Sequence, residues 1–191
     1  MRRRQVNLGQ GTLKWLLEPN EPSVRYSTLV NLLGKGAQDR QVTQTADSIG
    51  RRGWASELLA LQKEGTWWDN PSHCYIPKYN SCVWNLIVLA DLGMTKSDDR
   101  IRSACEHFIK LHNVESGGFS LRPVERPRFG PHICLTGNMV RTLSAFGYAA
   151  DPRLKKAVDW LLSQQLPDGG WNCYTASGAK ISSFKSTITA L

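Results

Sequence analysis

The sequence lacks several features that would assign a chain quickly to a class. It has no CxxC pair, and its five cysteines are scattered and odd in number: Cys74, Cys82, Cys105, Cys134 and Cys173. This usage argues against a disulfide framework and favours a reducing compartment, so we expect a cytoplasmic protein. No apolar run approaches the roughly 18 residues that a membrane span needs. The basic start, residues 1–4, is followed by polar residues and not by the apolar stretch of a signal peptide.

Acidic side chains are in deficit. The 16 Asp and Glu residues stand against 24 Lys and Arg, which gives a formal net charge of +8. This excess allows a diphosphate, an anionic membrane surface contacted peripherally, or nucleic acid as a partner; a basic surface without any partner is the alternative. The basic residues are dispersed and no nucleic-acid-binding module is visible, so we do not expect nucleic acid. With 191 residues, 41% of them hydrophobic, the chain can form one globular domain with a buried core.

A repeat organises the sequence. The stretches Gly65-Thr66-Trp67, Gly117-Gly118-Phe119 and Gly169-Gly170-Trp171 each place an aromatic residue two positions after a glycine, and the first glycines are spaced by 52 residues. Glycine permits a tight turn at the end of a helix, and the aromatic ring can pack against a neighbouring unit. We therefore interpret the aromatic residues as structural anchors. Each unit is predicted to hold an outer helix, this turn, a loop and an inner helix.

Two amphipathic outer helices are predicted before the second and third turns. Asp99 and Asp151 can cap them, and Pro152 suits a first helical turn. Apolar residues at positions i, i+4, i+7 and i+8 should lie on one buried face of each helix. These residues are Ile101, Cys105, Phe108 and Ile109 in one helix and Leu154, Val158, Leu161 and Leu162 in the other.

Inner helices are predicted over 82–93 and 133–147, where Gly93 and Gly147 can serve as C-caps. A third begins after residue 182, and the chain stops within it, so we expect a partial protein or one that closes by pairing with another copy. Residues 40–62 predict a further outer helix, weakened by Gly50 and Gly53, and residues 22–34 another helix. The units within the single domain are 1–39 (degenerate), 40–93, 94–147 and 148–191.

The third turn carries a family resemblance. Gln165-Leu166-Pro167-Asp168-Gly169-Gly170-Trp171 resembles the repeat of the prenyltransferase and squalene oxidase family, found in terpenoid cyclases and protein prenyltransferase β subunits. The stretch that starts at Gln62 is one residue shorter, and the second turn is a weaker match. The resemblance covers about residues 40–191. It implies an all-α, incomplete α/α toroid, with these anchors: Gln62, Gly65, Trp67, Gly117, Phe119, Gln165, Asp168, Gly169 and Trp171.

The resemblance implies that chemistry would take place in a central cavity lined by the inner helices. Class II terpene cyclases protonate their substrate from an Asp-x-Asp-Asp motif, which this sequence lacks; the pair Asp98-Asp99 opens an outer helix instead. Protein prenyltransferases hold a catalytic zinc. His132 and Cys134 lie where that family has two ligands, and both side chains can bind zinc. No histidine follows at residues 182–185, although Cys173, His73 and Cys74 could approach in the fold.

Other residues could bind substrate in such a cavity. Arg141 replaces an apolar residue of the preceding unit, Ile87, and could bind a diphosphate, as could Lys185; either could instead reach solvent or pair with a carboxylate. Aromatic residues could line an isoprenoid pocket and stabilise carbocations, or they could belong to the core. They are Tyr75, Tyr79, Trp84 and Phe184. His107 and His112 are expected to be surface groups.

Two functions remain open at this stage. One is a protein that binds or transforms an isoprenoid or another diphosphate-containing molecule in a central cavity, with the presence of catalysis undecided. The other is a non-catalytic α/α repeat scaffold that binds a protein partner or an anionic surface. The glycine–aromatic turns do not discriminate between them, because they define an architecture and not a chemistry.

Overall fold

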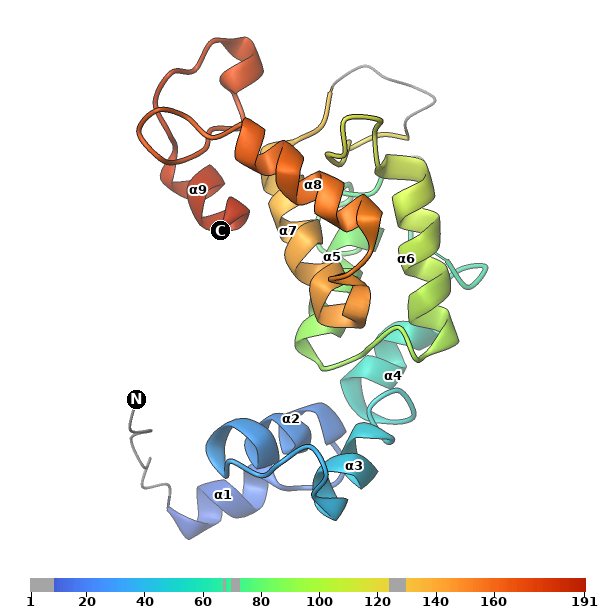
Figure 1. Ribbon diagram of the computed structural model, residues 1–191. Coiled ribbons are helices and arrows are strands. Elements are labelled where there is room, and N and C mark those ends of the chain that lie inside the picture. Colours follow the sequence, from blue (N-terminus) through green and yellow to red (C-terminus); the bar gives the residue numbers. More distant parts are fainter. Residues whose placement is uncertain (1–8, 67, 70–72, 124–129) are drawn as a thin grey trace. The chain divides into compact units, whose positions relative to one another are not determined.

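The computed structural model describes residues 9–66, 68–69, 73–123 and 130–191 (Figure 1). Over these ranges the chain is helical, with an isolated β-bridge between Asn113 and Phe119 and no β-strand. The all-α prediction is thus confirmed. Two compact units are present: unit 1 contains the residues up to Leu61 together with Asp91–Met94, and unit 2 contains Gln62–Ala90 and Thr95–Leu191. None of the helices in the described ranges is long and apolar enough to cross a membrane.

Unit 1 consists of short helices. Pro22 stands at the first position of its second helix, which continues directly into a π-helical turn, and a small core forms from Leu29, Val42, Ile49, Ala55, Leu59 and Met94. The elements are α1 (Gln10–Leu16), α2 (Pro22–Ser27), η1 (Thr28–Leu32), α3 (Arg40–Ala46) and α4 (Gly53–Ala60). The helix predicted over 22–34 is therefore present as α2 and η1.

The prediction of a single outer helix over 40–62 is wrong, because the helix is interrupted between α3 and α4. Gly53 has a φ of +70°, a left-handed conformation that few other residues adopt. A Cβ at this position would lie 2.7 Å from Glu21 Oε2. That carboxylate accepts a hydrogen bond from the backbone N–H of Trp54 at 3.2 Å, which satisfies a free donor at the start of α4.

In unit 2 the helices predicted as outer alternate along the chain with those predicted as inner, and these names are kept below (Figure 1). The predicted outer helices are α6 (Asp99–His112) and α8 (Pro152–Ser163); the predicted inner ones are α5 (Cys82–Asp91), α7 (Ile133–Leu143) and α9 (Phe184–Ala190). A π-helical turn, η2 (Ser144–Tyr148), extends α7, and a short 3₁₀-helix, η3 (Thr175–Ser177), precedes α9. Helix α7 packs against both α8 and α9. The helices predicted over 82–93 and 133–147 are therefore present.

Aspartates cap both outer helices. Asp151 accepts a hydrogen bond from the backbone N–H of Arg153 at 2.8 Å, and Pro152 occupies the first turn, as predicted. In α6 the cap is Asp98, which accepts from the backbone N–H of Arg100 at 2.9 Å. The predicted cap Asp99 is wrong by one residue: Asp98 has the extended backbone that a cap requires, whereas Asp99 is already helical.

Arg153 joins the two outer helices. Its Nη1 and Nη2 atoms donate to both carboxylate oxygens of Glu106 on α6, at 2.7 and 2.9 Å. Its Nε and Nη2 atoms also donate to the cap Asp151, at 3.0 and 2.7 Å. Hydrogen bonds from this guanidinium lower the pKa values of Glu106 and Asp151. A planar guanidinium with five donors suits such a double bidentate contact, which an ammonium could not make.

The predicted buried face of α6 is confirmed, since all four of its apolar residues are buried. In α8 the prediction is half right: Leu154 and Leu161 are buried, but Val158 and Leu162 are 37% and 59% exposed. The small Ala157 takes the central position of the buried face instead.

The expectation that His112 is a surface group is wrong. Its side chain is buried, stacks on Phe108 and lies with Nδ1 2.9 Å from the carbonyl oxygen of Ser120. Burial lowers the pKa of His112 to about 4, because the charged ring would lose its hydration.

The second and third glycine turns hold the following inner helix in the same way. Phe119 and Trp171 are buried, and their backbone N–H groups donate to hydroxyls inside α7 and α9: Thr136 Oγ1 at 2.9 Å and Thr187 Oγ1 at 3.1 Å. Their carbonyls accept from the N-cap residues of these helices, His132 and Ser183, each at 2.8 Å. The start of each inner helix is thereby tied to the turn before it.

The polar residues around the turns bond to backbone. Gln62 donates to the carbonyl of Gly65 at 3.0 Å, and Gln165 donates to that of Gly169 at 2.7 Å. Asp168 accepts from the backbone N–H of Ser182 at 2.8 Å, which fixes the loop leading to α9. Gly65, Gly117 and Gly169 have φ values of +67°, +103° and +86°. Trp67 lies outside the described residues.

The contact between α7 and α9 gives a test of the fold. A Cβ added to Gly137 would lie 2.0 Å from the carbonyl oxygen of Thr189, so Gly137→Ala must push the helices apart. We expect the free energy of unfolding to fall by about 1–3 kcal/mol, as in overpacked cores. Urea unfolding followed by circular dichroism measures it. Gly130→Ala is the control, since nothing lies within 4 Å of its Cβ position; equal stability of the two variants would contradict the packing.

Candidate functional site

Three aromatic side chains cluster at the start of α5 in unit 2. The ring centroids of Tyr75 and Trp84 are 4.8 Å apart, and those of Tyr79 and Trp84 are 5.1 Å apart, at tilted angles that favour ring–ring attraction. The indole N–H of Trp84 donates to the carbonyl oxygen of Tyr75 at 3.1 Å. Tyr79 is 73% exposed, so this group presents ring faces to solvent and is not buried in the core.

Two cysteines and a serine meet where α7 and α9 begin. Cys134, the second residue of α7, directs its backbone N–H at Cys173 Sγ, with 3.3 Å between nitrogen and sulfur. Its own thiol donates to Ser186 Oγ at 3.6 Å, and the backbone N–H of Cys173 donates to the same oxygen at 3.0 Å. Ser186 is buried, whereas both cysteines are half-buried.

The surroundings shift the pKa values of the two thiols in opposite directions. The pKa of Cys173 is lowered to about 6, chiefly by its interaction with the neighbouring Cys134 thiol, with smaller contributions from Ser186, from the Cys134 N–H and from the charge of Lys185. The pKa of Cys134 is raised, first by its interaction with Cys173 and second by partial burial. Cys173 is therefore the acceptor and the more nucleophilic sulfur of the pair.

The charge of Lys185 acts on both the Cys173 thiol and the Tyr75 hydroxyl. Burial raises the pKa of the Tyr75 phenol, and the charges of Cys134 and Cys173 act on the same hydroxyl. Groups from the loop before α5, from α7 and from the segment around α9 therefore influence one another electrostatically. The chemistry of the site combines exposed ring faces, a cation and a nucleophilic sulfur.

The other predicted site residues lie at the start of α7, at the start of α9 and in the last turn of α7. The backbone of His132 forms the N-cap of α7 and is half-buried, and Phe184, the first residue of α9, is 85% exposed. Arg141 is exposed in the last turn of α7. At 1.5 Å of rise per residue, the separation of seven positions between Cys134 and Arg141 corresponds to about 10 Å along the helix, so Arg141 belongs to a different part of the surface.

Of the three residues considered as a further zinc ligand, Cys173 does approach Cys134. Cys74 does not take part: its buried thiol donates toward the carbonyls of Ser120 and Leu121. Across the described residues, no three or more His, Cys, Asp or Glu side chains come together in a group able to hold a metal ion. The zinc site at His132 and Cys134 stays a prediction.

Sequence reasoning did not anticipate Ser186 or the position of Cys173 as an acceptor. The position of Ser186 could have been predicted from Ser183, three residues earlier. Ser183 Oγ caps α9 by accepting a hydrogen bond from the Ser186 N–H at 3.0 Å. That cap places Ser186 in the first turn of α9. Nothing in the sequence around Cys173 indicates that its sulfur faces α7.

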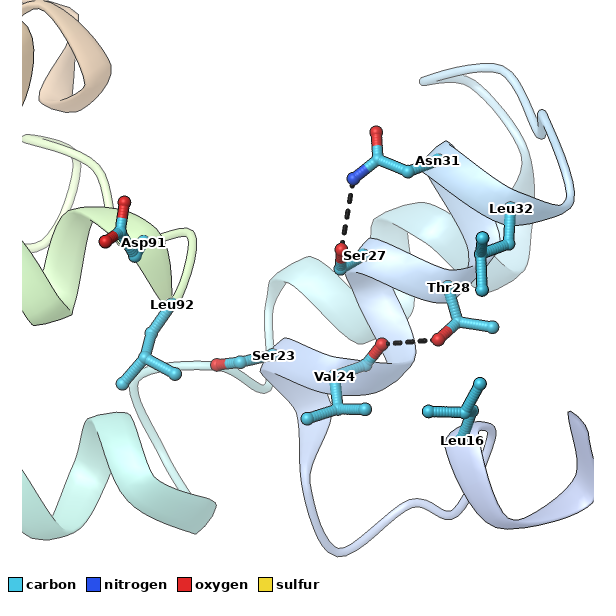
Figure 2. Close-up of a pocket in the computed structure, with 9 residues that line it drawn as sticks. All are labelled: Leu16, Ser23, Val24, Ser27, Thr28, Asn31, Leu32, Asp91 and Leu92. Carbon is cyan, nitrogen blue, oxygen red and sulfur yellow. Dashed lines mark hydrogen bonds between the residues drawn. The ribbon is translucent and has the colours of Figure 1, made fainter. Parts of the chain in front are cut away.

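Unit 1 contains a separate open pocket of about 370 Å³ (Figure 2). Its walls include Leu16, Val24, Leu32 and Leu92, and polar groups from α2 and η1 line the rest. Among those, Thr28 Oγ1 donates to the carbonyl of Val24 at 2.8 Å, and Asn31 donates to Ser27 at 3.0 Å. The lining residues include one carboxylate, Asp91, and no cation, so this pocket does not suit an anionic ligand.

Comparisons of the chain with family models, with curated proteins and with solved structures found no match. The resemblance in the glycine–aromatic turns therefore rests on the residues of this sequence alone.

The five thiols give a test of the site geometry. With iodoacetamide at pH 7, we expect Cys173 to be alkylated first, because it is half-buried and its pKa is lowered to about 6, whereas burial raises the pKa values of Cys74, Cys82 and Cys105. The rate at Cys173 should rise with pH through about 6 and then level off, because the thiolate reacts. Peptide mass spectrometry measures the order of labelling; simultaneous labelling of a buried cysteine would contradict it.

Proposed function

We propose that unit 2 binds a small amphiphile with an isoprenoid chain and an anionic head, such as a prenyl diphosphate, where the inner helices begin. The observation that carries the proposal is the cluster of the Tyr75, Tyr79 and Trp84 rings, together with the positive charge of Lys185, which acts on the Tyr75 hydroxyl. Binding sites for small molecules typically combine apolar and aromatic walls with a few polar groups that fix the orientation of the ligand.

The aromatic group suits the isoprenoid part. The indole of Trp84 is half-buried and its N–H is already satisfied by Tyr75, so its remaining surface is apolar. Tyr79 extends this surface toward solvent, and Phe184, adjacent to Lys185 on α9, adds an exposed ring. Flat aromatic faces bury much area at a small cost in side-chain entropy, which suits an unsaturated chain.

The charge at this site suits the head group. Lys185 is exposed, and its field lowers the pKa of Cys173. The neighbouring side chains are phenols, thiols and hydroxyls, and none of Tyr75, Cys134, Cys173 and Ser186 is a carboxylate. An ammonium without an acidic neighbour in this set is well suited to a phosphate oxygen.

We further infer that unit 2 is part of an α/α toroid with a repeat of about 52 residues. Two observations support this: the paired hydrogen bonds of Phe119 and Trp171 to the next inner helix, and the left-handed glycines at positions 65, 117 and 169. In such an architecture the starts of successive inner helices lie side by side, and the aromatic group, Cys134 and Lys185 are all at those starts.

A second candidate, a non-catalytic repeat scaffold that binds a protein, is favoured by one feature of α9. Phe184, Ile188 and Leu191 are 85%, 62% and 91% exposed and follow each other at helical spacing. A continuous exposed apolar row is typical of contact surfaces between proteins. Ile188→Ser would then abolish a protein contact and leave the binding of a prenyl diphosphate unchanged.

The leading proposal is tested by isothermal titration calorimetry with farnesyl diphosphate, farnesol and inorganic diphosphate. We expect farnesyl diphosphate to bind best, because only it uses both the rings and the lysine. Lys185→Gln should weaken it by about 10- to 100-fold, the worth of a charge-assisted hydrogen bond, and leave farnesol unchanged. Tyr79→Ala should weaken both prenyl compounds.

The matched control is Lys180→Gln, which removes the same charge from another exposed lysine five residues earlier. An equal loss of affinity in Lys180→Gln and Lys185→Gln would indicate general attraction to a basic surface. If none of the three compounds gave a heat of binding, the leading proposal would fail and the non-catalytic repeat scaffold would be the better-supported function.

A further inference from the structure

Cys134 and Cys173 lie close together, and their arrangement does not depend on the proposed ligand. Cys173 Sγ lies 3.3 Å from the backbone nitrogen of Cys134. Ser186 Oγ contacts both residues, 3.6 Å from Cys134 Sγ and 3.0 Å from the backbone nitrogen of Cys173. The two cysteines are therefore neighbours where α7 meets the loop before α9. A disulfide needs its sulfurs about 2 Å apart, a distance that side-chain rotation can reach from such a hydrogen-bonded arrangement.

The two thiols also differ from the other three in access. Cys134 and Cys173 are half-buried, whereas Cys74, Cys82 and Cys105 are buried. The thiol of Cys74 is directed at the backbone carbonyls of Ser120 and Leu121. Among the five cysteines, then, Cys134 and Cys173 are the two that are partly accessible to solvent, and the sulfur of one contacts the backbone of the other.

The surroundings of the pair favour an attack by Cys173. Its sulfur accepts from a backbone N–H in the first turn of α7, an eleven-residue helix, and Lys185 adds a positive charge nearby. Amide hydrogens and a cation stabilise a thiolate at this position. The Cys134 thiol donates to Ser186 Oγ and stays protonated, so it is available to react in a second step.

We propose that Cys134 and Cys173 are a reversible dithiol–disulfide pair that exchanges with a small disulfide of the glutathione type. The Cys173 thiolate attacks one sulfur of the oxidised reagent, whose S–S bond breaks and releases one thiolate. Cys134 then loses its proton to solvent and attacks the Cys173 sulfur of the mixed disulfide, which expels the second thiolate. Two protein thiols are oxidised to one disulfide, and one molecule of the reagent is reduced to two thiols.

Formation of this bond would change the site without changing the fold of the helices. It would join the first turn of α7 covalently to the loop that leads to α9, between residues 39 positions apart. The hydrogen bond from the Cys134 thiol to Ser186 would be lost. Since Ser186 also accepts from the Cys173 N–H and is bonded to the cap Ser183, the first turn of α9, which carries Lys185, would be the segment affected.

The experiment equilibrates the full chain with mixtures of oxidised and reduced glutathione, traps free thiols with N-ethylmaleimide in acid and maps the peptides by mass spectrometry without reduction. We expect a peptide pair joined through Cys134 and Cys173, lighter by two hydrogen atoms, that increases with the proportion of oxidised glutathione and disappears with dithiothreitol. The buried thiols Cys74, Cys82 and Cys105 should stay free. Circular dichroism before and after checks that the chain is still folded.

Two variants separate the steps. Cys134→Ser should stop at a glutathione adduct on Cys173, because the second thiol is missing. Cys173→Ser should form an adduct on Cys134 at least about tenfold more slowly, because the reactive sulfur is missing. A wild-type chain that keeps the Cys173 adduct without forming the crosslink would overturn the proposal, and so would crosslinks that involve the buried cysteines while the helical signal is intact.

Discussion

The structure of unit 2 depends on one hydrogen bond that follows each of its last two glycine turns. The residue after the glycines buries its aromatic ring, and this would strand its backbone N–H away from water at a cost of about 1–3 kcal/mol. A threonine hydroxyl of the next inner helix accepts this N–H at both places, Thr136 for Phe119 and Thr187 for Trp171. The aromatic ring can therefore be buried without this cost only when the inner helix is in place. The helix starts that carry Cys134 and Lys185 are positioned as a consequence.

Much of this arrangement was readable from the sequence because it depends on local chemistry. The glycine–aromatic spacing, the buried face of α6 and the Asp151 cap follow from which residues tolerate left-handed turns, apolar faces and helix ends. The failures are of another kind. Asp98 and Asp99 are equally good caps by composition, and only the backbone distinguishes them. The break before Gly53 depends on Glu21, more than thirty residues earlier.

The candidate site was harder to predict than the fold. Tyr79, Trp84, Cys134 and Lys185 could be named as candidates, because the family resemblance implies a cavity lined by the inner helices. Cys173 was one of three residues that could approach Cys134, and the choice among them is made by a tertiary contact between α7 and the loop before α9. Periodicity predicts which face of a helix is buried but not which sulfur a particular N–H will meet. His112 shows the same limit: the core takes in a polar ring when a backbone carbonyl, that of Ser120, is available to it.

The division of the chain has a practical meaning for anyone who wishes to handle its parts separately. Residues 91–94 belong to unit 1, although they follow the first segment of unit 2 along the chain. Met94 is buried there, and Leu92 forms one wall of the pocket in Figure 2. A single cut after Leu61 would therefore give an N-terminal fragment that lacks part of its own interior. The complementary fragment would retain that piece as exposed apolar residues with nothing of unit 1 to cover them.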